Sequence, residues 1–242
     1  MPLWGELSSP KFDDLRNENS VAILPCGSLE AHGKHLPLFT DMLLPTEISK
    51  VVAEKTDALV LPPIPFGDSW HFKDFPGTIS ISPDTLRNFY TEVLRAIIAN
   101  GIKKIIVLNG HGGNAGHIRA AAEEACEGND AIIVVINWWL DLGKDARKKV
   151  LETQEGHAAE DETSEVMAVR PDLVDLSKAV AWRPHFEFSF YSSKLRSKQL
   201  KDGMYGDPTK ASPAKGTVIV EAAINELVDF VKKFERGEFP KI

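Results

Sequence analysis

The sequence has little cysteine, no long apolar run and no leader-like start. Its two cysteines, Cys26 and Cys126, are isolated in a chain of 242 residues, which is long enough to need no cross-links. We therefore expect free thiols rather than a disulfide framework. No segment approaches the roughly 18 consecutive apolar residues of a membrane helix, and the first residues lack the basic start and apolar stretch of a signal peptide. These absences predict a cytoplasmic protein.

Basic residues are in the minority. Lys and Arg number 28 against 35 Asp and Glu, which gives a net charge of −7, and both signs are mixed along the chain. Nucleic acids and anionic membranes are bound through basic patches, so we expect neither as a partner. With 43% hydrophobic and 26% charged residues the composition is that of a globular protein. We expect one domain over residues 1–242 that acts on small molecules or peptides.

Short apolar segments alternate with longer amphipathic ones. The apolar segments, rich in Val, Ile and Leu, predict strands at 21–25, 58–64, 102–108 and 131–138, with a short one at 78–82. The amphipathic segments predict helices at 41–55 (or 45–55), 83–100, 112–126, 163–169 and 217–234. Strands that are apolar throughout are buried on both faces, as in parallel sheets covered by helices. The sequence therefore predicts an α/β fold, a three-layer α/β/α sandwich with a mostly parallel central sheet.

Two segments interrupt this alternation. Residues 62–76 are too rich in proline for a helix and too polar for the core. Residues 182–216 form a long excursion that combines Ser, Lys, Pro and Gly with several aromatic residues. Loops of this length usually bind a ligand, cover a site or pack on another subunit. The sequence is equally compatible with two roles for the excursion, a lid over the site and a contact with another subunit.

A cluster of metal-ligating side chains follows the first predicted strand. Residues 29–41 contain Glu30, His32, His35 and Asp41. Carboxylates and imidazoles without cysteine suit zinc, manganese or iron(II), whereas calcium prefers oxygen alone and structural zinc usually recruits thiolates. A mixed oxygen and nitrogen site more often performs chemistry than holds a fold, so this segment predicts a catalytic metal centre.

Reactive side chains also follow the other predicted strands. In open α/β sheets, ligands bind beyond the carboxyl ends of the strands, where these side chains would meet. Of the seven histidines, only His117 and His185 fall outside these strand ends. The residues expected at this edge of the sheet are Glu30, His32, Asp41, Ser69, His71, Asn109, His111, Trp138, Trp139 and, further along the chain, His157 and Glu162.

Four ordered motifs together resemble the creatininase (creatinine amidohydrolase) family. They are Gly-Ser-Leu-Glu-Ala-His-Gly-Lys-His-Leu-Pro-Leu-Phe-Thr-Asp, Phe-Pro-Gly-Thr, Asn-Gly-His-Gly-Gly-Asn and His-Ala-Ala-Glu-Asp-Glu-Thr-Ser, and they lie between residues 21 and about 172. The resemblance implies an α/β/α hydrolase that cleaves carbon–nitrogen bonds other than ordinary peptide bonds, in cyclic amides, formamides or peptide-like amides. It also implies two divalent metal ions per subunit and a homo-oligomer, often a hexamer.

The resemblance assigns metal ligands residue by residue. Glu30, Asp41 and His111 would hold one ion, and His32 would hold the other together with the same Asp41. Creatininase itself has a further glutamate ligand where this sequence has Gly113, so Glu162 is the natural replacement. This departure argues against creatinine as the substrate. Zinc is the first expectation for the metal, with manganese or iron as alternatives.

A metal-activated water would carry out the hydrolysis. Coordination lowers the pKa of water from about 15.7 toward about 7, and a second ion polarises the carbonyl oxygen. The departing nitrogen needs a proton, for which His157 is the candidate, because imidazole titrates in the useful range and the resemblance gives this histidine a catalytic role. The glutamate that precedes the histidine in creatininase is Gly156 here, which leaves Glu155 or Glu160 as a source of assistance.

Other residues at this edge have supporting roles. We expect Ser69, His71, Trp138 and Trp139 to bind substrate, although loop serines are common and one of two adjacent tryptophans normally faces the core. His71 could equally serve only to hold the proline-rich loop together. His35 is either a further metal ligand or, as we favour, a residue of the surrounding shell that orients a ligand, and Asn109 belongs to the same shell.

Two alternatives to a metal-dependent amidohydrolase are open. The glycines after Leu108 could form a phosphate-binding turn at a helix N-terminus, although their spacing is not that of the dinucleotide motif and the histidines would be unexplained. The chain could also be a non-catalytic, metal-bound member of the family. Stabilisation of the protein by a nucleotide cofactor would support the first alternative. Tightly bound metal without hydrolysis would support the second alternative.

Overall fold

Four parallel strands form the centre of the computed structural model, which describes residues 3–239. Their spatial order is β2-β1-β3-β4, and every neighbouring pair is parallel. Helical connections between consecutive strands make this arrangement possible. The strand bounds are β1 (Val21–Cys26), β2 (Leu59–Val60), β3 (Lys104–Asn109) and β4 (Ile132–Asn137).

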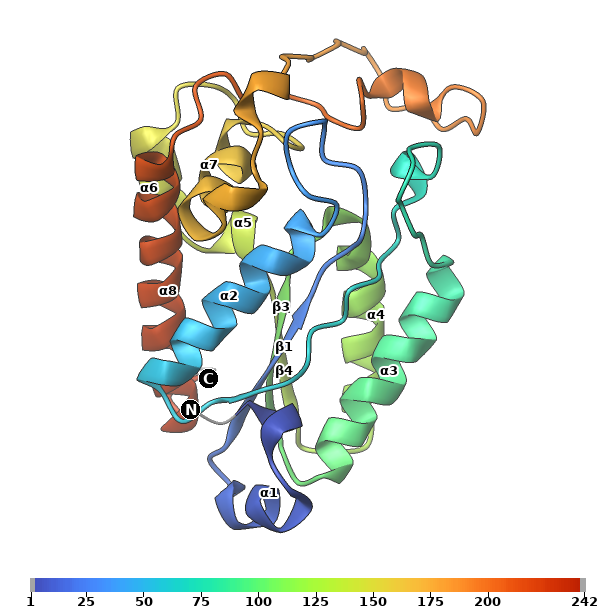
Figure 1. Cartoon of the computed structure of the whole chain (residues 1–242). Helices are drawn as coiled ribbons and strands as arrows, with labels where there is room; N and C mark the ends of the chain where they lie inside the picture. The colour runs from blue at the N-terminus through green and yellow to red at the C-terminus, as the bar shows by residue number, and fades with distance from the viewer. Residues whose placement is uncertain (1–2, 240–242) are drawn as a thin grey trace.

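Helices cover both faces of the sheet (Figure 1). On β1, Val21 and Ile23 join the core beneath one helical layer, whereas Ala22 and Leu24 join the core beneath the other. This alternation explains why the strands are apolar at nearly every position. The three-layer α/β/α prediction is confirmed. One layer contains α2 (Thr40–Lys55), α7 (Glu160–Val169) and α8 (Pro213–Glu235), and the other contains α3 (Pro83–Ala99) and α4 (Ala115–Cys126).

Shorter helices connect and flank these layers. The remaining α-helices are α1 (Ser9–Leu15), α5 (Trp138–Asp141) and α6 (Lys144–Val150). The 3-10 helices are η1 (Trp4–Glu6), η2 (Trp70–Phe72), η3 (Gly112–Asn114), η4 (Pro171–Leu173), η5 (Leu176–Lys178) and η6 (Arg196–Gln199). Within residues 3–239, no helix combines the length and apolar character that a membrane span requires.

Two predicted strands need correction. The segment 58–64 shortens to β2, because Pro62 and Pro63 have no N–H to donate to a ladder, although Ile64 still donates to the Pro25 carbonyl at 3.0 Å. The segment 78–82 forms no strand. It lies against loops beyond the sheet, where only isolated bridges form, from Ile79 to Leu29 and from Ser80 to Gly67.

The predicted excursion is four residues shorter than expected at its C-terminal end. Helix α8 begins at Pro213 rather than Thr217, because the Ser212 side chain accepts a hydrogen bond from the Lys215 N–H and caps the helix. The shorter excursion, residues 182–212, crosses the end of the molecule toward which the strands point (Figure 1).

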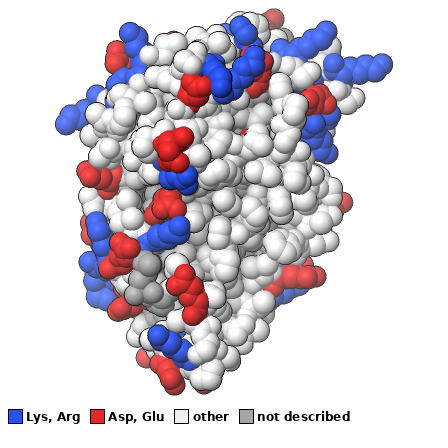
Figure 2. All heavy atoms as spheres, viewed as in Figure 1, with Lys and Arg blue, Asp and Glu red and all other residues white. Residues whose placement is uncertain are grey.

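In Figure 2, charged side chains of both signs lie along the upper rim and over the left part of the face, while its centre and right are mostly uncharged. This distribution agrees with the mixed charge pattern of the sequence.

Candidate metal centre

The predicted metal ligands meet at the carboxyl edge of the sheet. Glu30 and His32 lie in the loop after β1, and His111 directly follows Gly110 at the end of β3. Asp41 and Glu162 lie in the first turns of α2 and α7, where the positive ends of the helix dipoles favour carboxylates. Strand ends and helix starts therefore deliver all five side chains to one place.

Asp41 occupies the centre of this cluster. Its Oδ1 lies 2.8 Å from His32 Nε2 and its Oδ2 lies 2.7 Å from His111 Nδ1. Ser28, which the sequence did not single out, donates its hydroxyl to Oδ2 at 2.8 Å. Burial raises the pKa of Asp41, but the two imidazoles outweigh it and hold the pKa well below its usual range. Asp41 is thus a buried carboxylate with one histidine at each oxygen.

Glu30 is buried without matching partners. It is 0% exposed, and neither carboxylate oxygen has a hydrogen-bond partner among the described residues. Oε2 lies 3.4 Å from His111 Nε2, and Oε1 lies 3.9 Å from His157 Nδ1. Burial raises its pKa to about 7, against the opposing charge of His111. A buried carboxylate of this kind is costly unless a cation satisfies it.

Backbone and amide groups hold the two imidazoles in place. His32 Nδ1 donates to the Glu30 carbonyl at 3.1 Å, which turns Nε2 toward the centre. Asn109 donates to the His111 carbonyl at 2.8 Å and accepts the His111 N–H at 3.1 Å. A Cβ added at Gly110 would overlap the Asp41 carbonyl oxygen, so this glycine permits the close approach of β3 and α2.

The ligand atoms form two groups that share Asp41. Glu30, Asp41 and His111 make one, and His32, Asp41 and Glu162 make the other, with the ligand atoms of each within 4.8 Å of one another. The unpaired Glu30 oxygens and this mixed oxygen and nitrogen donor set fit two divalent cations. A third group consists of Glu30, His32 and His157.

His157 lies at the edge of the same cluster. Its Nε2 is 2.8 Å from the Ala31 carbonyl, which can only accept, so Nε2 carries the proton and Nδ1 is left unprotonated. Burial, together with the nearby His32, lowers the pKa of His157 to about 3. Neither predicted helper faces this ring, since Glu155 is exposed and Glu160 binds Lys215 and the N–H groups of residues 152 and 153. Glu30 is the carboxylate nearest to Nδ1 in the ion pairs described.

A cavity of about 230 Å³ opens onto the cluster. His71 and Trp139 line it, whereas the Trp138 ring is 2% exposed and packs in the core with the Arg147 guanidinium 4.7 Å from its centroid. The predicted substrate contact at Trp138 is therefore wrong, because the start of α5 turns adjacent side chains to different sides. Ser69 is buried at 1% exposure, with no hydrogen bond to its hydroxyl among the described residues.

Three histidines take positions that the sequence left open. His35 Nε2 is 3.0 Å from the Thr163 hydroxyl, beside Glu162 in α7, and His35 lies in none of the three ligand groups. His117 Nε2 is 3.1 Å from Asp68 Oδ2, and the Asp68 carbonyl accepts from His111 Nε2 at 2.8 Å. His185 lines a second cavity formed by the excursion. The sequence spacing gave no signal for Asp68 or for His185.

Comparison with known proteins adds an independent observation. A model of the creatininase family, described as creatinine amidohydrolase, matches residues 5–231. The creatinine amidohydrolase of Pseudomonas putida is 30% identical over 260 residues, which cover 98% of this chain and 96% of that protein. The mycofactocin precursor peptide peptidase of Mycolicibacterium smegmatis is 31% identical over 226 residues, which cover 89% of this chain and 85% of that protein.

Solved structures give the same result. A manganese form of creatininase superimposes with a TM-score of 0.88 at 28% identity, and the match covers 98% of each chain. A creatininase mutant of the Zn-Zn type superimposes with a TM-score of 0.87, also at 28% identity and over 98% of each chain. Similar proteins thus occur with two different divalent metals.

Proposed function

Because this chain belongs to the creatininase family and is a metal-dependent amidohydrolase, we propose that it hydrolyses a carbon–nitrogen bond of a small amide at a centre of two divalent ions. The observation that carries the proposal is the Asp41 carboxylate, which belongs to two groups of ligand atoms and has one oxygen against His32 and the other against His111. Glu30 and His111 would complete one ion site, and His32 and Glu162 the other. Two such ions supply an activated water and polarise the amide carbonyl.

The protein's own groups orient the ligands and move the proton. Ser28 and the two imidazoles hold Asp41, while Asn109 and the Asp68 carbonyl fix the His111 ring. In our proposal, His157 Nδ1 accepts a proton from the attacking water, because the lowered pKa leaves the ring neutral and the Ala31 carbonyl keeps the proton on the other ring nitrogen. The same low pKa makes the protonated ring a ready donor to the departing nitrogen. Trp139 and His71 would contact the substrate from the cavity wall.

We propose a substrate other than creatinine. The family members compared include a creatinine amidohydrolase and a precursor peptide peptidase, so the shared centre serves amides of very different size. Gly113 stands where creatininase has a glutamate ligand, and a Cβ there would overlap the Asp68 carbonyl oxygen. Zinc or manganese is the proposed metal, by analogy with the two solved forms. The homo-oligomer and the cytoplasmic location stay predictions.

Removal of metal tests the proposal. We expect dialysis against a chelator to abolish hydrolysis across a panel of cyclic amides, formamides and short peptide amides, and added zinc or manganese to restore it. Calcium is the matched control and should not restore activity, because it prefers oxygen ligands and each proposed site contains an imidazole nitrogen.

Two other results would change the conclusion. Hydrolysis that survives complete removal of metal would contradict the metal-dependent mechanism. Stoichiometric metal without hydrolysis of any amide in the panel would instead favour a non-catalytic member of the family.

A further inference from the structure

The excursion builds a second and larger cavity next to the candidate metal centre. Its volume is about 500 Å³, against about 230 Å³ for the cavity over the metal ligands. His71, Phe72 and His157 line both, so the two spaces share a wall. Cavities of roughly 300 to 1,000 Å³ are typical of small-molecule sites, and only the larger space falls within that range.

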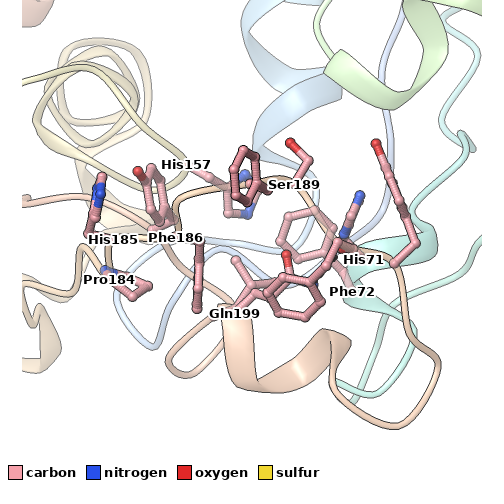
Figure 3. A pocket seen from close by; sticks show the side chains of 13 residues that line it. His71, Phe72, His157, Pro184, His185, Phe186, Ser189 and Gln199 are labelled. Atoms are coloured by element: carbon pink, nitrogen blue, oxygen red, sulfur yellow. Dashed lines mark hydrogen bonds between the residues drawn. The ribbon is translucent and has the colours of Figure 1, made fainter.

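The lining of this larger cavity is aromatic and carries no permanent charge. Figure 3 shows side chains of the excursion facing His71, Phe72 and His157 across it. None of the lining residues is Lys, Arg, Asp or Glu, so an ionised group placed here would lose water without gaining a partner. The aromatic rings that line it are Phe72, Phe186, Phe188, Phe190, Tyr191 and Tyr205.

The aromatic side chains of the excursion are left open to solvent. Phe188 is 75% exposed, Tyr191 is 77% exposed and Phe186 is 45% exposed. Phe186 and Phe190 already pack edge to face, with ring centroids 5.2 Å apart. A ligand ring that joined such a cluster would make stacking and edge-to-face contacts. These contacts stabilise binding in addition to the burial of the ring's apolar surface. The cavity therefore suits a flat aromatic group.

Polar contacts anchor the excursion to the rest of the site. Arg196 donates to both oxygens of Asp74 and its guanidinium lies 5.3 Å from the Trp70 ring, which fixes η6 to η2. The backbones of Tyr205 and His157 exchange hydrogen bonds of 2.7 and 2.9 Å. The wall of the large cavity is therefore bonded to the proposed catalytic histidine.

We propose that this cavity binds an uncharged aromatic substituent of the substrate while the attached amide enters the smaller cavity. The inference rests on the proposed function and names its substrate class, which is amides that carry an aromatic group. Because the two cavities share a wall at His71, Phe72 and His157, a short linker is enough to join the aromatic group to the amide. Such a substrate is larger than a single small ring, in agreement with the combined size of the two cavities.

Ligand-detected NMR with a pair of simple amides tests the inference. N-benzylacetamide and N-methylacetamide share the amide and differ in the aromatic group. Burial of a phenyl ring should make the benzyl compound bind at least about tenfold more tightly to the full-length protein. Phe186→Ala should weaken its binding about fivefold through the lost ring contacts, with no effect on N-methylacetamide. Phe89→Ala is the matched control, since Phe89 is 47% exposed on α3 and does not line the cavity.

Repeating the titration with Asp41→Ala separates this inference from the proposed function. Preference for the benzyl compound should persist in that variant even when metal and hydrolysis are lost, because Asp41 does not line the larger cavity. Equal binding of the two amides, or equal effects of Phe186→Ala and Phe89→Ala, would overturn the inference. So would a change of oligomeric state in Phe186→Ala with no change in benzyl binding, which would assign the aromatic side chains to a second copy of the chain.

Discussion

Replacing His157 by alanine is expected to lower kcat by about 10²- to 10⁴-fold, the usual contribution of a positioned acid or base. The unprotonated Nδ1 faces the candidate centre, 3.9 Å from Glu30 Oε1, while Nε2 is bonded to the Ala31 carbonyl. Single-turnover and steady-state hydrolysis of the best amide from the panel would measure the loss.

The metal content of the same variant is its essential control. If His157 moves protons, His157→Ala keeps the full metal content of the unmodified protein. Loss of metal together with activity would contradict this role and make His157 a ligand, as the group of Glu30, His32 and His157 allows.

Replacing Arg147 by methionine is expected to destabilise the protein by about 3–5 kcal/mol, the cost of breaking a buried ion pair from one side. Arg147 in α6 is 2% exposed, and its Nη1 donates to Glu165 Oε1 at 2.5 Å. Asp161 Oδ2 lies 4.0 Å away, and both carboxylates are buried in α7. Without the guanidinium, the two acids would face each other unpaired. Urea unfolding at pH 7.5 would measure the change.

The loss of stability in Arg147→Met should depend on pH. Burial raises the pKa of Asp161 to about 6 and that of Glu165 to about 7, in both cases against the opposing charge of Arg147. A carboxyl whose pKa is raised by folding contributes stability below its unfolded pKa, and this contribution is lost as the pH rises through the folded pKa. The defect of Arg147→Met should therefore be largest above about pH 7 and shrink toward pH 4, since protonation removes the unpaired charges.

Two further variants keep this prediction specific. Arg119→Met removes an arginine whose side chain is 79% exposed in α4 and should change stability by less than about 0.5 kcal/mol. Adding Glu165→Met to Arg147→Met should recover much of the loss, because apolar replacement of a whole buried pair is often neutral. A defect that is independent of pH and unrelieved by the second substitution would contradict the electrostatic account.

The sheet and the ligand cluster were predictable because both depend on the pattern of residues along the chain. Strands β1, β3 and β4 are apolar at nearly every position, and parallel strands bring their carboxyl ends to one edge. Glu30 and His111 follow two of these ends, so their proximity follows from topology alone. The segment 78–82 has a strand-like composition, but it lies beyond the sheet and finds only isolated partners.

The remaining features depend on tertiary contacts that no spacing reveals. Ser28 bonds Asp41 only because the loop after β1 folds back on α2. Arg147 is buried against the general preference of arginine for the surface, because two acids one helical turn apart in α7 face it. The aromatic cavity could not be predicted, because it depends on the path of the excursion through space and the composition of the excursion does not specify that path.

Elemental analysis of the purified protein and of Asp41→Ala tests whether the candidate centre holds two ions that share Asp41. We expect about two equivalents of zinc, manganese or iron per chain, as in two-metal hydrolases, and loss of metal in the variant because Asp41 belongs to both ligand groups. Absence of stoichiometric metal after reconstitution, or an unchanged metal content in Asp41→Ala, would contradict it.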